Sequence, residues 1–144
     1  MKEYSKVSNE QLIFSIQELK DKGLSYYKIN QLVKQGILIK LNKKYYENTN
    51  FDGEESDFYY AYGYVPNGVI CLLSAAVHYN LSTHRPDAID IAIPRKARVS
   101  TLPEWPELNI YYFTDERFSV GAEIIEVGKN RFCIYDIEKT VVDI

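Results

Sequence analysis

The first apolar residues of the chain recur at helical spacing. Ser8 and Gln11 form the pattern of a capping box, in which each side chain bonds the backbone amide of the other. Three apolar residues follow at intervals of four and three positions: Leu12, Ile16 and Leu19. Gly23 stands where a glycine commonly ends a helix. The pattern predicts a first helix between Ser8 and Gly23.

A second helix is predicted directly after the short turn 23–25. Ser25 can cap this helix and Gly36 can end it. One face of the helix is apolar and is made by four residues: Tyr26, Ile29, Leu32 and Val33. Two short helices joined by such a turn are typical of a helix-turn-helix.

Two β-prone stretches come next, 37–41 and 44–47, around the polar pair Asn42 and Lys43. A hairpin in this position is typical of the wing of a winged helix-turn-helix. The polar stretch 48–56 indicates a linker. We therefore expect a winged helix-turn-helix over residues 1–48.

The rest of the chain mixes strand and helix patterns. The aromatic cluster at 58–64 is interpreted as core, with a patch for a protein partner as the alternative. The same patterns predict a buried helix over 70–79, strands over 89–93 and 110–113, a hairpin over 124–127 and 132–135, and a helix capped by Asp136. The expected fold class is α+β, with a small mixed α/β domain over 49–144. The apolar end of the chain, up to Ile144, indicates that this domain continues beyond it.

Charge is distributed unevenly along the chain. Residues 1–50 hold nine lysines, no arginine and five acidic residues, which gives a net charge of +4. Residues 51–144 carry −7. A basic N-terminal stretch followed by an acidic remainder predicts two parts with different partners.

The sequence favours a cytoplasmic protein that neither spans a membrane nor acts as an enzyme. No apolar run approaches the roughly 20 residues that cross a bilayer, and no secretion signal is present at the start. Cys71 and Cys133 lie in apolar runs and are interpreted as buried free thiols. His78, Asp87 and Asp90 lack the partners and spacing of a catalytic or metal site, so no cofactor is predicted.

The outer face of the second helix is the strongest functional signal. Its lysines can neutralise phosphates, its amides can bind an adenine edge, and the helix N-terminus can hold a phosphate. The predicted DNA-contacting residues are Ser25, Tyr27, Lys28, Asn30, Gln31 and Lys34 on the helix, and Lys43 and Lys44 at the wing. An ordinary solvated amphipathic helix is the alternative. The lack of arginine argues against tight guanine contacts.

The order of these patterns resembles the AbiEi-type antitoxin family. The resemblance covers nearly the whole chain and is carried by residues 36–41 with 44–46, by 68–76 followed by His78 and Leu81, by 89–94, and by 135–143. It implies an antitoxin of a type IV toxin–antitoxin, or abortive-infection, system. Such proteins repress their own promoter by binding repeats in double-stranded DNA, and counter a nucleotidyltransferase toxin, usually without a tight complex.

Other functions remain open from the sequence. One is a non-catalytic interaction module whose basic N-terminal part docks an acidic partner, and another is an enzyme built on the second domain. A homodimer bound to two half-sites of DNA is also compatible with the pattern.

Overall fold

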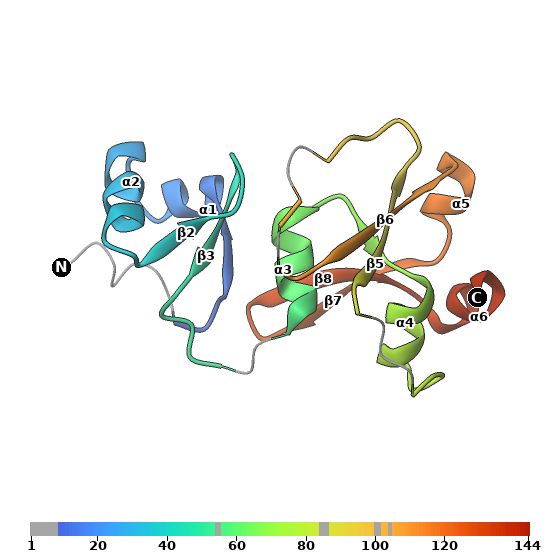
Figure 1. Cartoon of the computed structure of the whole chain (residues 1–144). Coiled ribbons are helices and arrows are strands. Elements are labelled where there is room, and N and C mark those ends of the chain that lie inside the picture. The colour runs from blue at the N-terminus through green and yellow to red at the C-terminus, as the bar shows by residue number, and fades with distance from the viewer. Residues whose placement is uncertain (1–8, 54–55, 84–86, 100–101, 104) are drawn as a thin grey trace.

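The computed structural model describes residues 9–53, 56–83, 87–99, 102–103 and 105–144. These residues form a mixed α+β fold with six helices and two separate β-sheets (Figure 1). The N-terminal elements are β1 (Ile13–Ser15), α1 (Ile16–Asp21), α2 (Tyr26–Lys34), β2 (Leu38–Lys40) and β3 (Tyr45–Asn48). The elements that follow are α3 (Asp57–Tyr64), β4 (Val69–Ile70), α4 (Leu72–His78), β5 (Ile89–Pro94), β6 (Leu108–Phe113), α5 (Asp115–Ser119), β7 (Ala122–Val127), β8 (Asn130–Tyr135) and α6 (Ile137–Asp143).

The first helix is shorter than the sequence predicts, and it begins at Ile16. A capping box does start it, but the pair is Ser15 and Glu18: the Ser15 hydroxyl accepts from the Glu18 amide at 3.1 Å, and the Glu18 carboxylate accepts from the Ser15 amide at 2.9 Å. Ser8 lies outside the described residues. The preceding residues form β1, in which Ile13 and Phe14 point to opposite faces and meet different cores.

The second helix and the hairpin are confirmed. The Ser25 hydroxyl accepts from the Lys28 amide, so Ser25 caps α2 as expected. Gly23 and Gly36 have φ values of 93° and 79°, a conformation that residues with a side chain rarely adopt, and each follows the end of a helix. β2 and β3 pair antiparallel, and β1 joins on the other side of β3, which gives the sheet order β1-β3-β2.

A compact apolar core holds α1 and α2 against the first sheet. Its buried members are Phe14, Leu19, Leu24, Ile29, Leu32, Leu38 and Tyr46. All of them lie between β1 and β3 in the chain, so this part of the molecule has a core of its own.

The second sheet has the strand order β6-β5-β4-β8-β7 and mixes parallel and antiparallel pairs. β5 runs parallel to β6 and β4 parallel to β8, while β4–β5 and β7–β8 are antiparallel. The hairpin around Gly128 and the Asp136 cap of α6 are confirmed. The helix expected over 70–79 begins later, at Leu72, because Val69 and Ile70 form β4.

β5 is a buried strand, although the polar residue Asp90 alternates with its isoleucines. Asp90 is only 3% exposed. Its carboxylate accepts from the Asn109 amide at 3.3 Å, and its backbone amide donates to the Ser74 hydroxyl at 2.9 Å. A buried polar residue whose groups are hydrogen-bonded is tolerated within a sheet, so the alternation does not indicate exposure here.

The two sheets are joined by a second, larger core and by hydrogen bonds. Helix α3 lies between them (Figure 1), and its Tyr59 and Tyr60 share this core with Leu12, Ile13 and Leu41 of the N-terminal part. The aromatic cluster at 58–64 therefore contributes to the core, as predicted. The linker expected from residue 48 begins later, because Asn48 ends β3 and is fully buried.

Asn130 makes the most buried polar contact between the two parts. Its side-chain oxygen accepts from the Leu12 amide at 2.7 Å, and its amide nitrogen donates to the Glu10 carbonyl at 3.3 Å. Asn42 adds a second link by donating to the Gly63 carbonyl at 2.9 Å. The core described above therefore crosses residue 48, where the sequence suggested a domain boundary.

Candidate nucleic-acid interface

Helix α2 presents most of the predicted DNA-contacting residues on its outer side. Its inner side is fixed by the buried residues Ile29 and Leu32. Because residues three and four positions apart share a helix face, this packing directs Tyr27, Gln31 and Lys34 to solvent. Tyr27 is 69% exposed, while Lys28 and Asn30 are half-buried at the sides of the helix.

Tyr27 and Gln31 act as a pair. The Gln31 side-chain amide donates a hydrogen bond of 2.8 Å to the Tyr27 hydroxyl, four residues earlier. The bond holds both side chains over one turn of the helix and leaves the Gln31 carbonyl and the Tyr27 O–H to face an incoming ligand. A pre-ordered polar pair loses less side-chain entropy when it binds.

The N-terminus of α2 adds a place for an anion. The Ser25 oxygen already accepts from the Lys28 amide at 3.2 Å, but its O–H can still donate. The first amides of an α-helix have no acceptor within the helix. The start of α2 thus presents N–H and O–H donors at the positive end of the helix dipole.

The charge around α2 is uniformly positive over a long stretch. Residues 22–46 contain six lysines and no acidic residue. The nearest acidic residues on either side are Asp21, whose carboxylate accepts from the Gln17 side chain at 2.9 Å, and Glu47, which accepts from the Tyr60 hydroxyl at 3.1 Å. The six lysines therefore give this stretch a positive charge that its two flanking carboxylates only partly offset.

The two lysines expected at the wing lie on a different part of the surface. Lys43 and Lys44 are exposed in the turn between β2 and β3. Asn42 holds this turn, because its oxygen accepts from the backbone amides of Lys44 and Tyr45 while its nitrogen binds Gly63 of α3. The turn is beside α3, whereas α2 is on the far side of the first sheet from α3 (Figure 1). The structure brings the α2 residues together and sets the turn lysines apart from them.

The residues weighed as catalytic candidates do not converge. Asp87 is exposed ahead of β5, whereas Asp90 is buried beside Ser74 and Asn109. His78 packs its ring against aromatic neighbours, with ring-centre distances of 4.9 Å to Tyr79 and 5.8 Å to Phe132. Among the described residues, no group of three His, Cys, Asp or Glu side chains could hold a metal ion.

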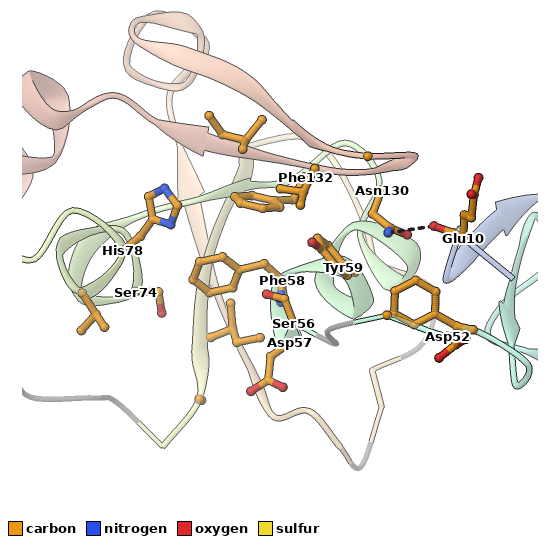
Figure 2. Close-up of a pocket in the computed structure, with 18 residues that line it drawn as sticks. Glu10, Asp52, Ser56, Asp57, Phe58, Tyr59, Ser74, His78, Asn130 and Phe132 are labelled. Atoms are coloured by element: carbon orange, nitrogen blue, oxygen red, sulfur yellow. Dashed lines mark hydrogen bonds between the residues drawn. The ribbon is translucent and has the colours of Figure 1, made fainter.

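A large cavity is the feature that sequence reasoning missed. It has a volume of about 920 Å³ and lies between the chain around residues 51–53, α3, α4 and the β7–β8 hairpin (Figure 2). Its aromatic walls include Phe58 and Phe132, which are 74 positions apart. No local pattern could have indicated that these residues meet.

In the described part of the chain, no helix is long and apolar enough to cross a membrane. A scan against models of known protein families gives no match for this sequence, and a search of curated proteins gives none either.

Proposed function

We propose that this protein is a DNA-binding transcriptional repressor, and that β1, α1, α2 and the β2–β3 hairpin form a winged helix-turn-helix. The observation that carries the proposal is the outer face of α2, where exposed lysine, amide and tyrosine side chains project from a stretch without any acidic residue. The buried residues Ile29 and Leu32 fix this face relative to the sheet, so the helix is presented as a rigid unit.

In this proposal α2 enters the major groove of double-stranded DNA. Lys28 and Lys34 neutralise phosphates on either side of the groove, and Asn30 and Gln31 contact base edges. The Ser25 hydroxyl and the amides at the start of α2 bind a phosphate oxygen. Lys43 and Lys44 would touch the DNA only where it extends past the hairpin turn, so we expect them to contribute less than Lys34.

The biological role that we propose is that of an autorepressing antitoxin of a type IV toxin–antitoxin system. It rests on the resemblance to AbiEi-type antitoxins in the order of the motifs. In this role the protein binds repeats in its own promoter, as a homodimer on two half-sites, and counters a nucleotidyltransferase toxin without forming a tight complex. A matched test is growth of cells that express a nucleotidyltransferase toxin of such a system with or without this protein. Unchanged toxicity would reject the antitoxin role and leave the DNA-binding proposal standing.

The DNA-binding proposal is tested by fluorescence anisotropy with a labelled duplex of about 30 base pairs from the promoter of the gene. Binding should weaken as salt rises, with a slope in log K against log salt of about −0.9 for each phosphate contact. Lys34→Glu should reduce the affinity at least about tenfold, because it replaces a phosphate contact by a repulsion. Lys96→Glu makes the same charge change on an exposed site after β5 and is the matched control.

Both variants should melt within about 1 °C of the natural sequence, since both side chains are exposed. Equal losses of affinity in the two variants would show that only net charge matters and would contradict an interface on α2. Binding of an acidic protein such as poly-glutamate as tightly as DNA would instead favour an interaction module for acidic partners.

A further inference from the structure

The cavity beside α3 has the size and the walls of a ligand site. At about 920 Å³ it lies within the range of 300–1,000 Å³ that is typical of small-molecule pockets. Six parts of the chain form it: Glu10, the stretch 51–53, the start of α3, one side of α4, the start of β5, and the β7–β8 hairpin. In Figure 2, Phe58, His78 and Phe132 lie together on one side, and Glu10 and Asp52 lie at the other end.

The floor of the cavity is apolar and aromatic. Phe58 and Phe132 meet edge to face with ring centres 5.2 Å apart, and the His78 ring is 6.1 Å from Phe58. Ile89 and Ile125 add aliphatic surface to this lining. Such a floor binds the ring or the alkyl part of a ligand through burial of apolar surface.

All the charged side chains that line the cavity among the described residues are acidic. Glu10, Asp52 and Asp57 contribute three carboxylates, and none of the described lining residues is Lys or Arg. Lys129 offsets part of this charge, because its ammonium is 3.4 Å from the Glu10 carboxylate. Burial against the aromatic rings lowers the pKa of His78, so His78 adds no positive charge at neutral pH. The hydroxyl oxygens of Ser56 and Ser74 each accept from a backbone amide, and their O–H groups remain as neutral donors.

We propose that this cavity binds a small organic cation with an apolar body, such as an aromatic or alkyl amine. The aromatic floor takes the apolar body, and the ammonium lies toward the carboxylates of Asp52 and Asp57. An anion of the same shape is repelled by the three carboxylates. Because the walls come from both the N-terminal part and the body of the protein, a bound amine contacts both and stabilises their arrangement.

The proposal does not depend on DNA binding and is tested without DNA. Tryptamine is the probe, and indole-3-propionate is the anionic counterpart with the same ring. Binding is measured by isothermal titration calorimetry and by the shift in melting temperature of the full chain. Tryptamine should bind and raise the melting temperature, and indole-3-propionate should bind at least about tenfold more weakly.

Neighbouring residues on β7 provide a matched pair of variants. Ile125 lines the cavity, whereas Ile124 is 63% exposed and, as the adjacent residue of a strand, points to the opposite face. Ile125→Lys places a cation in the cavity and should weaken tryptamine binding at least about tenfold, while Ile124→Lys should leave it unchanged. Melting curves establish whether both variants are folded.

A milder pair keeps the test valid if Ile125→Lys unfolds the protein. Asp57→Asn removes one exposed carboxylate of the rim and should weaken tryptamine binding about twofold to fivefold. Asp115→Asn changes an exposed carboxylate on α5, outside the cavity, and should have no effect. The proposal is overturned if tryptamine does not bind at millimolar concentration, if indole-3-propionate binds equally well, or if Asp57→Asn binds like the natural sequence.

Discussion

Replacing Asn130 by alanine should test how strongly the two parts of the molecule are joined. The Asn130 side chain bonds Leu12, whose side chain is 1% exposed, and the Glu10 carbonyl. Asn130→Ala leaves the Leu12 amide buried without its acceptor, which costs about 1–3 kcal/mol, and it removes a second hydrogen bond worth about 1 kcal/mol. We expect a total loss of about 2–4 kcal/mol in the free energy of unfolding.

Thermal unfolding followed by circular dichroism measures this loss. For a chain of this length, roughly 3 °C in melting temperature corresponds to 1 kcal/mol, so Asn130→Ala should lower the melting temperature by about 6–12 °C. Asn50→Ala is the control, because the Asn50 side chain is exposed and its backbone amide, which bonds Asn48, is retained. A melting temperature of Asn130→Ala within about 2 °C of the control would refute the reasoning.

Three further outcomes follow from the burial and hydrogen bonds of single residues. Leu32→Ala should lower the free energy of unfolding by about 2–5 kcal/mol, measured by urea titration, because Leu32 is buried in the first core; a loss under 1 kcal/mol would mean that this face of α2 is not packed. Asn42→Ala should cost about 1–3 kcal/mol in the same titration, since it removes the bond to Gly63 and the acceptor of two turn amides, and a neutral result would contradict an anchored turn. Burial raises the pKa of Tyr45 to about 12 and also raises the pKa of the Cys71 thiol. The unfolded chain therefore loses these protons at a lower pH than the folded protein, and the free energy of unfolding should fall as the pH rises from about 10 to about 12. Equal free energies of unfolding from urea titrations at pH 8 and pH 11 would contradict this.

Helix α2 is predictable because all of its signals are local. The cap at Ser25, the apolar residues and the glycine at position 36 lie within 12 positions of one another, and each acts through its own neighbours. The outer face of the candidate site follows directly from that assignment. Local signals also suffice for the hairpins and for the Asp136 cap of α6.

The beginning of the first helix is not predictable in this way. Ser8 with Gln11 and Ser15 with Glu18 are two possible capping boxes, and the local sequence does not distinguish them. The choice is made by strand pairing, because Ile13 lies opposite Glu47 of β3. That pairing joins residues 34 positions apart and places Ile13 in a strand, so the helix cannot begin before it.

The position of the hairpin turn and the cavity have the same long-range origin. The bond from Asn42 to Gly63 places the turn lysines beside α3, and no pattern near residue 42 indicates this contact. The meeting of Phe58 with Phe132 likewise depends on the packing of α3 on β8. Tertiary contacts of this kind decide which exposed residues share a surface.

The order of strands in the second sheet has a consequence for how the protein is made. β8, the last strand of the 144 residues, lies between β4 and β7, and Ile134 pairs with Ile70. A ribosome completes β3 on the order of ten seconds before it releases β8, at typical rates of synthesis. The basic N-terminal part can therefore fold while the second sheet still lacks an inner strand. At that stage the backbone amide of Leu12 has not yet formed its hydrogen bond to the Asn130 side chain. The nascent chain passes through a stage with an open edge on β4, which is the period when it most needs protection from aggregation.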